Sequence, residues 1–175
     1  MINLRTVFYI TIIIEGYVVL ATELLAIRQL IPFVGSGTET IAVIIAAVLL
    51  PLAFGYSSGG RYKAKKVGNK LVTIREKLIR NVINSTLLIT LGLSFAILEV
   101  FFFALFEVGI ENKVLQTTIY SLCFLVFPIY LLGQTVPLVS NYFSDDKLSE
   151  VTGKMLFFST TGSFMGSVVS TLVLM

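Results

Sequence analysis

Residues 40–58 read TIAVIIAAVLLPLAFGYSS, an apolar run that contains no charged side chain. An α-helix needs about 20 mostly apolar residues to cross the hydrocarbon core of a bilayer. The run has this length, and it is too long for a buried strand. It therefore predicts a transmembrane helix.

The rest of the chain follows the same pattern. Of its 175 residues, 56% are hydrophobic and only 13% are charged, whereas about a quarter of the residues of a soluble domain are charged. We therefore predict a single domain, residues 1–175, that is all-α: an integral membrane bundle of about five transmembrane helices with short loops. The expected spans are residues 7–33, 40–58, 85–106, 115–142 and 155–175.

The connection between the second and third spans carries most of the positive charge. Eight of the thirteen Lys and Arg residues lie in it. Cytoplasmic loops are enriched in Lys and Arg, so we expect this loop and the amino terminus to be cytoplasmic, with no nucleic acid as partner. The basic residues are Arg61, Lys63, Lys65, Lys66, Lys70, Arg75, Lys77 and Arg80.

Apolar residues recur at helical spacing inside the same connection. They predict either an amphipathic helix on the cytoplasmic face of the bilayer or an extension of the third span. These apolar residues are Leu71, Ile74, Leu78, Ile79 and Val82.

The sequence gives no sign of a catalytic, metal or cofactor site. Histidine is absent, and Cys123 is the single cysteine. The chain has no phosphate-binding glycine loop and no serine nucleophile elbow. We therefore expect neither an enzyme nor a bound cofactor or metal.

A few ionisable and amide side chains interrupt the apolar spans and form a candidate intramembrane polar site. They are Glu15, Glu23, Arg28, Glu99 and Gln134. In the predicted topology Glu23 and Glu99 lie at the same depth in the bilayer. Glu15 and Gln134 also lie at a common depth, nearer the cytoplasm. Arg28 is expected to pair with Glu23 or Glu99, or to extend to the outer headgroups.

Two interpretations of these groups stay open. A charged group in hydrocarbon must face the bundle interior, a partner or a watery cavity, so the groups can line a cation path together with Tyr17 and Tyr130. Alternatively, they join helices through hydrogen bonds.

Small residues and prolines mark packing faces and bends. Gly162 and Gly166 are four residues apart, a spacing that lets helix backbones approach closely, either within the chain or against another chain. Pro51, Pro128 and Pro137 predict kinks. The polar residues before Pro137 indicate either a substrate contact or a kink whose free carbonyl is satisfied.

Three blocks of the sequence resemble the membrane domain of bacterial spermidine-synthase-like proteins. The first runs from Glu23-Leu-Leu-Ala-Ile-Arg28 to Gly59-Gly60-Arg61, the second includes Gly133-Gln134-Thr135-Val136-Pro137-Leu138, and the third ends in Thr161-Gly162-Ser-Phe-Met-Gly166. The resemblance implies a membrane module linked to polyamine aminopropyl transfer. The catalytic domain of that family is not part of this sequence.

The resemblance favours a non-catalytic multi-pass subunit or anchor in the bacterial inner membrane. Its partners would be the lipid bilayer, other protein subunits and a soluble aminopropyltransferase-like chain. One alternative is a transporter or channel component for a small cation such as a polyamine. Another is a structural subunit that assembles through the face of Gly162 and Gly166.

Overall fold

The computed structural model describes residues 4–62, 70–143 and 148–173, and all regular structure within them is α-helical. The prediction of an all-helical chain is confirmed. Three helices are long and apolar enough to cross a membrane, or up to five if each of two bent pairs forms one span. The helices are α1 (Leu4–Val34), α2 (Thr38–Gly60), α3 (Lys70–Gly92), α4 (Phe95–Glu107), α5 (Lys113–Phe124), α6 (Val126–Gly133), α7 (Thr135–Tyr142) and α8 (Leu148–Val173).

The short links use residues suited to helix ends. Gly35 and Gly109 have φ angles of 80° and 85°, the left-handed conformation that glycine adopts without strain, and they end α1 and α4. Asn112 precedes α5, and its side chain accepts hydrogen bonds from the backbone N–H groups of Val114 and Leu115 at 3.0 and 3.1 Å. These caps satisfy backbone groups that have no partner inside the helix.

The predicted third span is not one straight helix. It breaks between Gly92 and Phe95, and α4 turns by 64° from the axis of α3. The helix also starts earlier than the predicted residue 85. Helix α3 begins at Lys70 and includes the last basic residues of the connection, Arg75, Lys77 and Arg80. Of the two alternatives for that segment, the structure therefore shows an extension of the third span, with Ile74 and Leu78 buried.

The predicted fourth span is divided as well. It breaks at Leu125, where the direction changes by 46°, and again at Gln134. Each break lies three residues before a proline, Pro128 and Pro137. Proline has no N–H to donate and its ring collides with the preceding turn, so the helix stops and restarts with proline in its first turn. By contrast, α2 continues through Pro51 as one helix.

The last helix begins seven residues before the predicted span. Leu148–Lys154, expected to belong to a loop, forms the first turns of α8. Glu150 lies in the first turn, where the helix dipole favours a negative charge, and Lys154 contacts it at 2.7 Å. Charged residues thus extend the helix beyond its apolar part, and residues 174 and 175 lie outside the described ranges.

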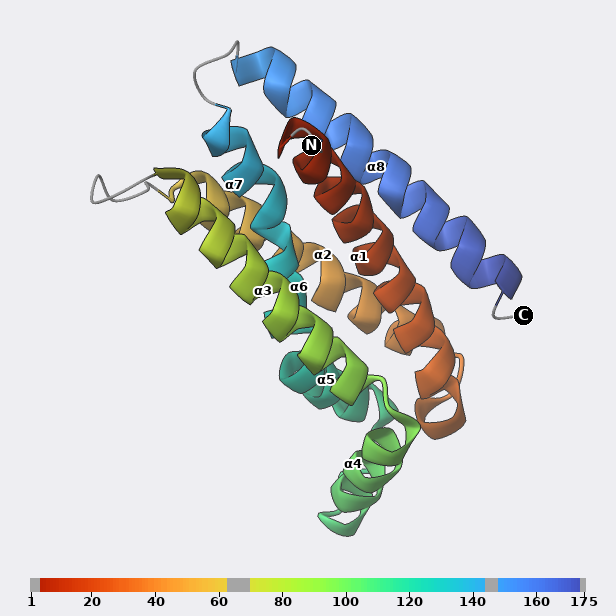
Figure 1. Cartoon of the computed structure of the whole chain (residues 1–175). Coiled ribbons are helices and arrows are strands. Elements are labelled where there is room, and N and C mark those ends of the chain that lie inside the picture. The colour runs from red at the N-terminus through yellow and green to blue at the C-terminus, as the bar shows by residue number, and fades with distance from the viewer. Residues whose placement is uncertain (1–3, 63–69, 144–147, 174–175) are drawn as a thin grey trace.

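The helices form a bundle in which α1 and α8 run side by side in the same direction (Figure 1). Helix α2 packs against α5, α6 and α7, and α3 packs against α6 and α7. The amino-terminal ends of α1 and α8 lie at one end of the bundle, together with the end of α7. Helix α4 projects at the opposite end.

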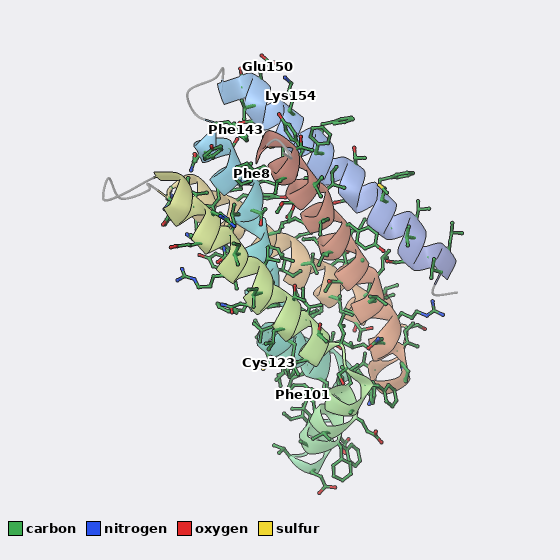
Figure 2. All side chains as sticks on the ribbon, viewed as in Figure 1. Phe8, Phe101, Cys123, Phe143, Glu150 and Lys154 are labelled. Carbon is green, nitrogen blue, oxygen red and sulfur yellow. The ribbon has the colours of Figure 1, made fainter. Side chains whose placement is uncertain are left out.

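The two ends carry separate aromatic clusters. At the amino-terminal end, the rings of Phe8 and Phe143 meet edge to face with centroids 5.8 Å apart, near Glu150 and Lys154 (Figure 2). At the other end, Phe101 lies among the aromatic residues of α4 and α5. Such contacts contribute roughly 0.5–1.5 kcal/mol beyond simple burial.

Candidate functional site

The most enclosed carboxyl group of the candidate polar site is Glu15, on α1. Its side chain is only 3% exposed. The Ser159 hydroxyl on α8 donates a hydrogen bond to Glu15 Oε2 at 3.2 Å, and the Tyr56 side chain on α2 also approaches Ser159. Among the described residues, Glu15 has no Lys or Arg partner. Three helices therefore converge on one buried polar group.

A second buried polar cluster joins α3 to the broken fourth segment. The side-chain amide of Asn81 donates to the backbone oxygen of Leu131 at 3.3 Å and to Gln134 Oε1 at 3.1 Å. The Ser85 hydroxyl donates to the backbone oxygen of Pro128 at 3.0 Å. Side chains of α3 therefore supply hydrogen bonds beside both proline breaks. Of the two interpretations of this run, these contacts favour a kink stabilised by hydrogen bonds to Leu131 and Gln134, whereas the Thr135 hydroxyl is buried without a partner among the described residues.

The other members of the predicted polar site do not join Glu15. Glu23 is half-buried, whereas Arg28 and Glu99 are exposed. Glu99 lies near the end of α1, away from Glu23, because α4 turns by 64° from α3 and its Phe102 ring stacks on that of Phe33 with centroids 4.9 Å apart. Within residues 4–62, 70–143 and 148–173, Arg28 forms no ion pair with either glutamate.

Glu15 and Gln134, predicted to share a depth, belong to separate polar clusters, because Gln134 bonds to Asn81 and Glu15 to Ser159. The described acidic residues include no group of three that can hold a metal ion.

The glycine face lies inside the chain. A methyl group added at Gly162 would overlap the backbone oxygen of Ile13, and one at Gly166 would overlap that of Tyr17. Gly16 of α1 faces the backbone of Ser159 in the same way. The two helices are thus in backbone contact, and the question of whether this face packs within the chain or against another chain is answered in favour of α1.

The basic connection is described in part. Lys63, Lys65 and Lys66 lie outside the described residues, and Lys70 is the first residue of α3. Arg61, Arg75 and Arg80 are exposed, whereas the Lys77 ammonium lies 3.8 Å from the centroid of the Tyr62 ring.

The carboxyl-terminal end of α7 lies beside the start of the α2–α3 connection. The Asn141 amide donates to the backbone oxygens of Gly59, Gly60 and Tyr62 at 3.3–3.4 Å. It therefore caps α2 and holds the α2–α3 and α7–α8 connections together where they begin.

Sequence reasoning missed the groove between α2 and the α5–α6 segment. It has a volume of about 900 Å³, and its walls are almost entirely apolar. Its lining includes Val43, Leu50, Phe54, Arg61, Ser121 and Tyr130. Tyr130, expected beside the glutamates, contributes to this groove instead. The sequence feature that indicates it is the line of small and apolar residues along α2.

No protein-family model, curated protein or solved structure matches this chain. Its function must therefore be argued from its own residues.

Proposed function

We propose that this chain is a non-catalytic, multi-pass subunit of the bacterial inner membrane that anchors a soluble partner at its cytoplasmic end. The observation that supports a membrane location best is the exposure of large apolar side chains on nearly every helix. Leu50 is 62% exposed, Phe54 61% and Leu172 73%. Soluble monomers rarely expose apolar patches larger than a few hundred Å², whereas lipid is a favourable solvent for such a surface.

Five spans follow if each bent pair crosses the bilayer once, and the amino terminus is then cytoplasmic. The parallel course of α1 and α8 is consistent with an odd number of crossings. The basic residues of the α2–α3 connection favour the cytoplasmic side for that end.

The same end offers charged groups to a partner. Arg61, Arg75 and Arg80 are exposed there, and Glu150 and Lys154 begin α8 close by. On the family resemblance, we propose that the partner is an aminopropyltransferase-like chain. Charged rims of this kind guide association and specificity.

Mild-detergent purification from native membranes, followed by mass spectrometry of the retained proteins, tests the anchor. We expect an aminopropyltransferase-like chain, or a longer form of this chain that carries such a domain. Recovery of the chain alone, or with unrelated proteins only, would overturn the anchor.

Charge reversal locates the docking surface. The double variant Arg75→Glu/Arg80→Glu should retain about tenfold less partner. The two glutamates would repel an acidic surface of the partner that the arginines attract. The matched control is Glu107→Lys/Glu111→Lys, which reverses two exposed charges at the opposite end of the bundle. Equal retention by both variants would place docking elsewhere.

A second candidate, a path for a small cation, is favoured by one observation: Glu15 is buried at the meeting point of three helices. Spermidine flux into proteoliposomes separates the candidates. Loss of flux in Glu15→Gln, with the wild-type chain active, would support the path. No flux in the wild type would exclude it.

The third candidate, a structural subunit, would need a surface other than the face of Gly162 and Gly166, because α1 covers that face.

A further inference from the structure

The groove between α2 and the α5–α6 segment is open along the side of the bundle, not at its end. Its rim bears side chains that are more than half exposed, namely Leu50, Phe54, Leu122 and Phe127. Alanines of α2 also contribute to its lining, where a small side chain leaves room. Its volume of about 900 Å³ is at the upper end of the roughly 300–1,000 Å³ typical of small-molecule sites.

Charge is present at one end of this groove only. Arg61, directly after α2, is the charged residue of its lining, and the Ser57 and Ser58 hydroxyls lie one helical turn before it. Within the described part of the chain, the Arg61 guanidinium forms no hydrogen bond or ion pair. It is therefore free to bind an anion.

The dimensions of the groove match a membrane lipid. From Val43 to Arg61, α2 advances about 27 Å at roughly 1.5 Å per residue, close to the roughly 30 Å thickness of the hydrocarbon core. In the proposed topology α2 crosses the bilayer, so the groove would run along the bilayer normal with Arg61 at the level of the cytoplasmic headgroups.

We propose that this groove binds an anionic phospholipid of the inner leaflet. The phosphate of its headgroup contacts the guanidinium of Arg61, and an acyl chain lies along Phe54 and Leu50. Guanidinium binds phosphate through two parallel hydrogen bonds, which a lysine cannot reproduce. The inference rests on the membrane location in the proposed function, but not on the identity of any protein partner.

Charge complementarity favours a lipid over a partner helix as the occupant. A partner helix would need an acidic residue at its cytoplasmic end to match Arg61, whereas the cytoplasmic flanks of transmembrane helices are enriched in Lys and Arg. An anionic lipid has the same arrangement as the groove, with an anion at one end and hydrocarbon beyond it.

Native mass spectrometry of the full chain with dioleoyl phosphatidylglycerol and dioleoyl phosphatidylcholine in equal amounts tests the inference. These lipids differ in headgroup charge but have the same chains. We expect about a tenfold preference for the anionic lipid, the size of one charge-assisted contact. Arg61→Gln should abolish the preference, whereas the matched control Arg75→Gln, an exposed arginine outside the groove, should keep it.

A second variant tests the apolar part of the site. Ser57 is exposed on the groove wall, so Ser57→Phe fills the groove without entering the core and should reduce retention of both lipids. Circular dichroism checks that each variant keeps its helices.

The inference is overturned if the wild type shows no headgroup preference, if Arg61→Gln behaves as Arg75→Gln does, or if Ser57→Phe binds both lipids normally. Capture of another protein chain by a photo-crosslinker at Phe54, in place of lipid, would also overturn it. Carbonate extraction separates these failures from failure of the membrane location, because a chain that stays in the membrane pellet still supports that location.

Discussion

At the scale of single residues, Glu15 is the side chain whose surroundings are most unusual. It is enclosed by three helices and accepts a hydrogen bond from Ser159, with no cation from the described residues beside it. A buried polar group that loses its hydrogen-bond partner destabilises the fold by about 1–3 kcal/mol. The role of Glu15 in stability is therefore that of an acceptor between α1 and α8.

We expect Glu15→Gln to change the free energy of unfolding by less than about 1 kcal/mol, because the amide oxygen still accepts from Ser159. Glu15→Ala should destabilise the fold by about 1–3 kcal/mol, since it removes the acceptor and leaves a cavity. Unfolding by SDS in mixed micelles, followed by circular dichroism, measures both. Glu99→Gln, at an exposed carboxyl on α4, is the control. Equal destabilisation by Gln and Ala would show that Glu15 acts as more than an acceptor.

A second prediction at this scale concerns Asn81, which is 4% exposed and donates to both Leu131 and Gln134. Asn81→Ala should lower the free energy of unfolding by about 1–3 kcal/mol, because it leaves the buried Gln134 Oε1 without a donor and removes one of the two hydrogen bonds to the Leu131 oxygen. Asn84→Ala, one turn further along α3 on an exposed site, should change it by less than about 0.5 kcal/mol. The same micelle assay applies, and equal effects would contradict the proposed role of Asn81.

At the scale of helices, the contact between α1 and α8 depends on three glycines: Gly16, Gly162 and Gly166. In lipid, the hydrophobic effect does not drive transmembrane helices together. Close packing of the two backbones therefore supplies the attraction between them. Any side chain at these positions would separate the pair.

Alanine substitutions test this contact within one helix. Gly162→Ala should destabilise the fold by about 1–3 kcal/mol through overpacking, because the added methyl group meets the Ile13 backbone. Gly153→Ala, on the same helix with open space around it, should be neutral or stabilise by up to about 1 kcal/mol, since alanine is the better helix former. The measurement is again unfolding in mixed micelles. If both variants behaved alike, the close contact between α1 and α8 would be excluded.

The sequence predicted the helices better than their breaks. A long apolar run predicts a span. The apolar runs continue without change through Leu125 and across Gly92–Ser94, so hydropathy alone does not locate the bends there. The prolines at 128 and 137 indicated that kinks exist, yet Pro51 carries the same signal without a break in α2.

The polar contacts were harder to predict because they depend on which helix faces which. In the sequence, Ser159 is one of several small residues of the last predicted span, and Asn81 lies before the start of the third, so neither stands out as a hydrogen-bond partner. A shared depth did not indicate the partners of Glu15 and Gln134, which lie on other helices. Depth restricts the possible pairs, but the rotation of each helix about its axis selects among them.

At the scale of the whole molecule, the number of crossings is the property on which the anchor depends. If the bent pairs α3–α4 and α5–α7 each cross the bilayer, the α4–α5 link lies outside and the chain has five spans. If both pairs are re-entrant, that link stays on the cytoplasmic side and only α1, α2 and α8 cross. The two arrangements put Glu111 on opposite sides.

Labelling of single cysteines with a membrane-impermeant maleimide distinguishes the two arrangements. In a Cys123→Ala background, we expect Glu111→Cys to react in intact cells and Arg75→Cys to react only after permeabilisation. All of these substitutions are at exposed sites. Ser36→Cys, at an exposed site in the α1–α2 link, lies outside in both arrangements, because α1 and α2 cross in both, and it serves as the positive control. Protection of Glu111→Cys, with Ser36→Cys labelled, would establish three spans. The α4–α5 link, with Glu107 and Glu111, would then add negative charge to the cytoplasmic side of the membrane.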